Sequence, residues 1–149
     1  MMNKKSRTIL KIIGAYEIFF SIKLLWNVGN GRMNSIIIGD NLILGVQANI
    51  AFLTIAMLGL CVGFGLMKLH KWSFYGFISL SVLLISVYLS NLLLIDFDSL
   101  VGFYGTVPDN YLADFRQDIL RRLFVVFCLA LIVLFARKPL VSKKRLTNQ

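Results

Sequence analysis

The sequence predicts an all-α integral membrane protein: one bundle of four transmembrane helices with both termini in the cytoplasm. Hydrophobic residues make up 58% of the 149 positions, against about 45–50% in an ordinary soluble domain. They fall into long blocks, which is the pattern of membrane spans. Lysine and arginine flank these blocks mainly on one side. We therefore expect a single membrane domain over 1–149, with no room for a separate soluble domain.

Four apolar segments are long enough to cross a bilayer, which takes about 20 residues. They cover 9–28, 48–67, 74–95 and 119–136. The first is predicted to be a retained helix and not a signal peptide, because Glu17 interrupts it and no small-residue cleavage site follows Trp26. The second and third contain no charge, whereas two arginines stand near the start of the fourth.

The distribution of basic residues predicts the orientation, since cytoplasmic segments of membrane proteins are enriched in lysine and arginine. One side carries Lys4, Lys5, Arg7, Lys11, Lys68, Lys71, Arg137, Lys138, Lys143, Lys144 and Arg145. The other side carries Arg32, Arg116, Arg121 and Arg122, together with all six aspartates. The first side is predicted to be cytoplasmic, where it would contact anionic lipid headgroups. This explains the net charge of +9 without a nucleic-acid partner.

The first outer loop covers 29–47 and contains two aliphatic runs around Gly39-Asp40-Asn41. Residues that tolerate positive φ between two extended runs favour a short β-hairpin. Because the alternation is incomplete, a short interfacial helix or a re-entrant segment is almost equally compatible.

The second outer loop precedes the fourth helix, for which Asp109 is a candidate N-cap. Leu112, Phe115 and Ile119 recur at helical spacing. The helix is therefore expected to begin near Asn110 as an amphipathic turn at the membrane surface. The acids Asp96 and Asp98 are interpreted as a solvated span end and not as a metal site, which would need several carboxylates in a fixed array.

Glu17 is the candidate functional residue, because it lies near the middle of the first span. A charged acid there costs about 2.5 kcal/mol or more, so such residues usually face the bundle interior and often serve function. Its helical neighbours Gly14 and Ser21 form a narrow stripe suited to close helix contact. Three interpretations remain open: Glu17 is a proton- or cation-coupled site, it is a neutral acid hydrogen-bonded to a neighbouring helix, or the first helix lies shallower in the membrane. Lys23 points about 120° away from it and cannot pair with it.

Small residues mark further helix-packing positions. Gly59 and Gly63 have the Gly-x-x-x-Gly spacing that permits close backbone approach. A second stripe lies on one face of the third span and comprises Gly76, Ser79, Ser86 and Ser90. The faces of the second and third spans are expected to pack against each other. No catalytic, cofactor-binding or metal site is predicted. The single histidine, His70, and the distant Cys61 and Cys128 give neither a nucleophile–base pair nor a cluster of metal ligands.

The segment Gly63-Phe-Gly-Leu-Met-Lys-Leu-His-Lys-Trp72 resembles the turn between helices in many small bacterial four-helix membrane proteins. The resemblance covers about a dozen residues and implies a fold but no chemistry. The expected location is a bacterial inner membrane. The small multidrug-resistance transporters also have a glutamate in their first helix. However, Gly14-Ala-Tyr-Glu17 departs from their pattern, and the aromatic and proline features of their later helices are missing.

Three functions are compatible with these features. The leading hypothesis is a non-enzymatic accessory or scaffold subunit that binds a membrane protein partner or forms a homo-oligomer. The second is a small proton-coupled transporter or channel-like protein that uses Glu17. The third, suggested only by size and the basic C-terminal tail, is a holin- or immunity-type membrane protein.

Overall fold

The computed structural model describes residues 4–33, 35–38, 41–95, 98, 101–102, 105 and 111–142, with side chains up to 136. Along the chain follow helix α1 (Lys4–Gly29), strands β1 (Ser35–Ile38) and β2 (Asn41–Leu44), and helices α2 (Gly45–Met67), α3 (Lys71–Leu94) and α5 (Tyr111–Ser142). Three helices are long and apolar enough to cross a membrane: Gly45–Met67, Lys71–Leu94 and Tyr111–Ala136. This indicates an integral membrane protein.

Helix α1 is not among these three helices, although the sequence predicts a span over 9–28. It is 26 residues long, so length is not the reason. Its basic first turns, Glu17 and Lys23 lower its apolar character. The sequence-predicted spans over 48–67, 74–95 and 119–136 lie within or close to α2, α3 and α5, and each of these helices extends beyond one or both span limits.

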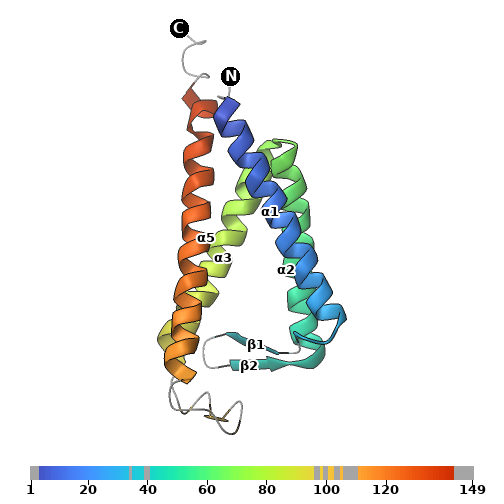
Figure 1. Ribbon diagram of the computed structural model, residues 1–149, viewed down its shortest axis with the longest axis vertical. Helices are drawn as coiled ribbons and strands as arrows, with labels where there is room; N and C mark the ends of the chain where they lie inside the picture. The colour runs from blue at the N-terminus through green and yellow to red at the C-terminus, as the bar shows by residue number, and fades with distance from the viewer. Residues whose placement is uncertain are drawn as a thin grey trace.

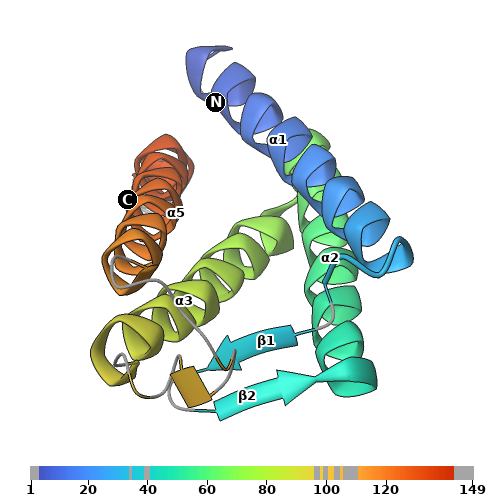
Figure 2. The same cartoon turned by 60° about the horizontal axis from the view of Figure 1, so that its bottom comes forward.

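The helices form two pairs that meet at one end and separate at the other (Figure 1). α1 packs along α2, and α3 packs beside α5, while the hairpin lies across the wide end (Figure 2). The main core cluster draws on all four helices and comprises Leu10, Ile13, Val62, Leu66, Phe74, Phe77, Val133 and Ala136. It joins the two pairs at the end where the chain begins.

The first outer loop contains the antiparallel hairpin β1–β2, with Ser35 opposite Leu44 and Ile37 opposite Leu42. The hairpin alternative is thus the one the structure adopts, whereas Gly39 and Asp40 lie outside the described residues. Ile37 is buried with Ile95, at the end of α3, and Leu42 packs on them. The loop therefore packs on the bundle through its apolar side chains.

The start of α5 completes this second small core. Leu112 and Phe115 pack against Ile37 and Ile95, and Tyr111 stacks on Phe115 with ring centroids 6.4 Å apart. Arg116 Nη2 donates a hydrogen bond of 3.2 Å to the Ile95 carbonyl oxygen. The first turns of α5 thus pack on the hairpin and on the end of α3. The sequence predicts a position at the membrane surface for these turns but not this contact. The predicted N-cap Asp109, the neighbouring Asn110, Asp96 and the basic tail 143–149 lie outside the described residues.

Candidate functional site

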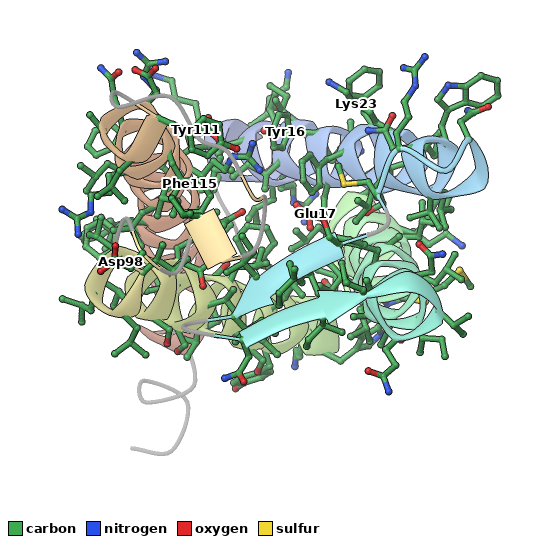
Figure 3. All side chains as sticks on the ribbon, turned by 90° about the horizontal axis from the view of Figure 1, so that it is seen from below. Tyr16, Glu17, Lys23, Asp98, Tyr111 and Phe115 are labelled. Carbon is green, nitrogen blue, oxygen red and sulfur yellow. The ribbon has the colours of Figure 1, made fainter. Side chains whose placement is uncertain are left out.

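Glu17 lies on the buried face of α1, on the stripe that also carries Gly14, Ser21 and Leu24. Spacings of three and four residues place these side chains on one side of the helix, which faces α2. Only 9% of Glu17 is exposed. Figure 3 shows Glu17 directed into the molecule and Lys23 directed away from it, as their angular separation predicts.

A bare stretch of α2 backbone makes room for Glu17. Glu17 Oε1 lies 3.3 Å from the position that a Cβ on Gly59 would occupy, and Ser21 Oγ lies closer still to the same position. Any side chain at position 59 would therefore displace these polar groups. Among the residues that the structure describes, no hydrogen bond or ion pair is formed by the Glu17 carboxyl group.

One turn along, the backbones of α1 and α2 touch at two glycines. A Cβ on Gly14 would lie 2.7 Å from the Gly63 carbonyl oxygen, and one on Gly63 would lie 2.9 Å from the Gly14 carbonyl oxygen. Real Cβ atoms do not approach that closely, so both positions require glycine. We call the contact made by Gly14, Glu17, Ser21, Gly59 and Gly63 the α1–α2 seam.

This arrangement differs from the expectation that Gly59 and Gly63 face the third span. α1 supplies the matching small residues, Gly14 and Ser21, whereas the part of α3 next to α2 begins with the bulky Trp72. Gly76 is the member of the α3 stripe that meets α2: a Cβ there would lie 2.9 Å from Val62 Cγ2. α2 therefore uses Gly59 and Gly63 for α1 and turns Gly65 to α3, where a Cβ on Gly65 would lie 2.6 Å from Ser73 Cβ.

The other members of the α3 stripe face outward. Ser79 and Ser86 are exposed and Ser90 is half-buried, so the predicted packing of this stripe on the second span is wrong for these serines. Ser86 Oγ donates a 2.9 Å hydrogen bond to the Val82 carbonyl oxygen of its own helix. A hydroxyl satisfied in this way can face an apolar environment at low cost.

The buried face of α3 was missed because the serine spacing points to the opposite side. This face carries Phe74, Phe77, Leu80 and Ser81, all nearly inaccessible. Ser81 Oγ donates to the Phe77 carbonyl oxygen at 2.8 Å. The recurrence of large aromatic side chains at i and i+3 is the signal that could have identified the core side of this helix.

A polar cluster lies between α3 and α5, in the halves of these helices that are nearer the hairpin. Arg122 and Asp118 form an ion pair with a separation of 2.7 Å, and both side chains are more than half exposed. The Arg122 guanidinium also interacts with the Tyr88 hydroxyl of α3, and Tyr16 of α1 lies close enough to Tyr88 to interact electrostatically with it. Because its charges pair with one another, this cluster offers no free ion to Glu17.

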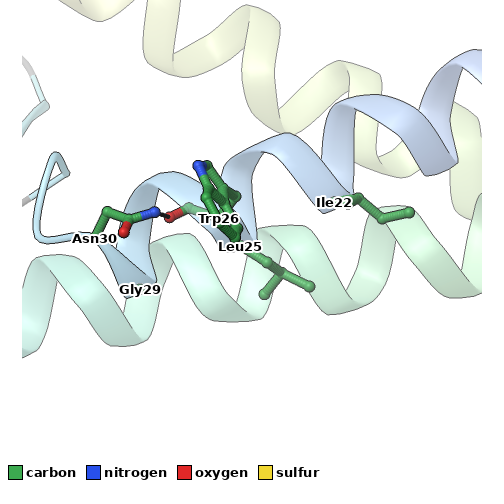
Figure 4. A pocket seen from close by; sticks show the side chains of 5 residues that line it. All are labelled: Ile22, Leu25, Trp26, Gly29 and Asn30. Atoms are coloured by element: carbon green, nitrogen blue, oxygen red, sulfur yellow. Dashed lines mark hydrogen bonds between the residues drawn. The ribbon is translucent and has the colours of Figure 1, made fainter.

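The other candidate residues that the structure describes are not brought together into a catalytic or metal-binding site. Within the described ranges no group of three or more histidine, cysteine, aspartate or glutamate side chains could hold a metal ion. His70 stacks on Trp72 with ring centroids 6.4 Å apart, and the cysteines are free thiols. An open depression at the end of α1 is lined by Ile22, Leu25, Trp26, Gly29 and Asn30 (Figure 4). One of its polar groups is used within the chain, since Asn30 Nδ2 donates to the Trp26 carbonyl oxygen at 2.8 Å.

Comparison with known proteins gives no relative: no family model, curated protein or solved structure matches the chain. Two local features therefore remain as the basis for a functional argument. They are the buried Glu17 on the α1–α2 seam and the outward-facing serines of α3.

Proposed function

We propose that the protein is a non-enzymatic multi-pass membrane subunit that acts as an accessory or scaffold component of a larger membrane complex. The observation that carries this proposal is the exposed pair Ser79 and Ser86 on α3. In membranes, small residues on a helix face favour contact with another helix, because they allow close backbone approach. The other small-residue stripe of the chain, on α1 and α2, is packed in this way.

All four helices cross the bilayer in this proposal, α1 included. Several exposed side chains of α1 beyond its basic first turns are large and apolar, as Ile12 (63%), Phe19 (68%) and Trp26 (68%) illustrate, whereas its polar Glu17 and Ser21 are buried. This inverted pattern suits a helix surrounded by lipid and not by water. Lys23 is exposed and close enough to the outer end of α1 to extend its ammonium group towards the headgroups.

Both termini and the α2–α3 turn lie on the cytoplasmic side of a bacterial inner membrane in this proposal. Lys4, Lys5, Arg7, Lys68 and Lys71 are all exposed, at the end of the molecule where the chain begins (Figure 1). Each basic side chain near an anionic surface contributes about 1 kcal/mol of attraction. These residues would hold that end of the bundle at the headgroups.

The partner that fits the Ser79–Ser86 face is a transmembrane helix of another protein. A photo-crosslinking amino acid at position 86 should join the chain to a partner subunit, and the same amino acid at Thr54 serves as the matched control. Thr54 is an exposed residue of α2 whose hydroxyl also bonds its own helix, at 2.8 Å to the Ile50 carbonyl oxygen. Crosslinks from position 86 to lipid alone would contradict the proposal, and crosslinks to a second copy would replace the partner by a homo-oligomer.

Replacing both serines by leucine should release this partner. Leucine suits lipid but keeps helices apart, and inserting larger side chains into a packed contact costs about 1–3 kcal/mol. The partner recovered in mild detergent from Ser79→Leu/Ser86→Leu membranes should fall by about tenfold, whereas Thr54→Leu should leave it unchanged. Equal recovery from both variants would contradict a role of the α3 face.

A second candidate function is a small proton-coupled transporter, and the burial of Glu17 favours it. An ionisable residue inside a membrane often belongs to an ion pathway. Proton-dependent flux into proteoliposomes should then disappear in Glu17→Gln and persist in Ser86→Ala. Absence of flux from the unmodified protein across a panel of substrates, with proton leak unchanged, would leave the subunit role as the proposal.

A further inference from the structure

The α1–α2 seam offers very different hydrogen-bonding possibilities to the two charge states of Glu17. Backbone N–H groups in the middle of α2 are used within the helix, whereas a helix carbonyl oxygen retains a second lone pair. Gly59 leaves this backbone uncovered beside Glu17 Oε1. A neutral carboxyl group can donate its O–H to such an oxygen, but a carboxylate can only accept and finds no donor on α2.

Among the residues that the structure describes, no charged group is placed to stabilise a carboxylate at position 17. α2 contains no charged side chain over Gly45–Met67. On α1, Lys11 and Lys23 each lie six residues from Glu17, about 120° around the helix, and both are exposed. From α5, Arg122 is paired with Asp118, and it also interacts with Tyr88 of α3. On the seam itself, Ser21 is the one side chain able to donate.

We propose that Glu17, with Ser21 and the bare backbone at Gly59, forms an intramembrane proton-binding site on the α1–α2 seam, occupied by a proton at neutral pH. The site holds Glu17 as a carboxylic acid, nine-tenths buried and directed at α2. Proton binding does not require transport, so this site stands or falls independently of flux. It equally does not require the partner proposed for α3.

A spectroscopic test is unusually direct, because Glu17 is the only glutamate in the chain. Protein synthesised in a cell-free reaction with glutamate carrying carbon-13 in its side-chain carboxyl group reports on this group alone. In lipid vesicles at neutral pH, the infrared spectrum should contain the isotope-shifted C=O band of a neutral acid. This band should be lost in Glu17→Gln and retained in Ser21→Ala, which removes the one nearby donor. Carboxylate bands alone at neutral pH would overturn the proposal.

A chemical test reads the same proton. A neutral carboxyl group adds its O–H across a C=N bond of a carbodiimide, and the O-acylisourea rearranges to a stable N-acylurea with no leaving group. A lipid-soluble carbodiimide should therefore add one reagent mass to the peptide containing Glu17, whereas a water-soluble carbodiimide should leave it unmodified. The exposed Asp114 and Asp118 should show the opposite preference. Labelling of Glu17 by the water-soluble reagent would show a carboxyl group open to water and not enclosed on the seam, and would overturn the proposal.

Discussion

At the residue scale, serine hydroxyls of α3 are placed where the helical backbone can satisfy them. Ser81 and Ser86 donate to carbonyl oxygens of their own helix. Asn91 instead reaches another element: its Nδ2 donates a 2.9 Å hydrogen bond to the Ile37 carbonyl oxygen of β1, over a sequence separation of 54 residues. This buried bond ties the outer end of α3 to the hairpin.

Removing the Asn91 amide should loosen the hairpin. A buried acceptor left without its donor costs about 1–3 kcal/mol, so Asn91→Ala should speed amide hydrogen exchange in β1 and β2. Ser86→Ala is the matched control, because the lost hydroxyl bonds only within its own helix and its removal should leave hairpin exchange unchanged. Equal exchange in Asn91→Ala and the unmodified protein would show that apolar packing on Ile95 holds the hairpin alone.

At the element scale, the existence of each helix follows from its apolar block, whereas the partner of each face does not. The Gly59–Gly63 spacing identified a close-packing surface, but choosing its partner required knowing that Gly14 and Ser21 lie opposite. On α3, the serine spacing predicted the packing face on the exposed side of the helix. Helical periodicity cannot distinguish an exposed stripe from a buried one when both are uncharged. Glu17 was recognisable because an acid in the middle of an apolar segment needs an explanation.

The α1–α2 seam predicts a sharp difference between two glycines. In Gly63→Ala, the new methyl group would meet Ile18 Cγ1 at 2.8 Å as well as the Gly14 carbonyl oxygen, and overpacking of this kind costs about 1–3 kcal/mol. Gly29→Ala, at the end of α1, adds a methyl group with nothing within 4 Å. Unfolding in detergent micelles should be easier for Gly63→Ala only. If both variants unfold alike, the helices are not in contact at Gly63.

At the scale of the whole molecule, the two helix pairs are joined by a large core at one end, whereas a small core at the other end packs the hairpin on α3 and α5. The basic first turns of α1 and the lysines of the α2–α3 turn lie at the end with the larger core, and the hairpin lies across the opposite end (Figure 1). Charge and packing thus distinguish the two ends of the bundle. The orientation that we propose rests on this asymmetry.

Thiol labelling measures the orientation. In the intact cells of a bacterial host, an impermeant maleimide should react with a cysteine introduced at Ser35 and spare cysteines introduced at Lys4 and Lys68, with Cys61 and Cys128 replaced by alanine. Inside-out vesicles should reverse the pattern. Labelling of positions 4 and 35 from the same side would show that α1 lies along the membrane and does not cross it.

The seam also has a consequence for how the chain enters the membrane during synthesis. α1 emerges from the ribosome first, yet it carries Glu17, and an acid at the centre of a helix opposes insertion by about 2.5–3.5 kcal/mol. α2, which is uncharged, follows after the hairpin and covers that acid. Biogenesis should therefore proceed through an α1–α2 unit: chains that end after Asn30 should insert poorly in a translocon assay, and chains that end after Met67 should insert both helices. Glu17→Leu should remove this dependence of the first helix on the second.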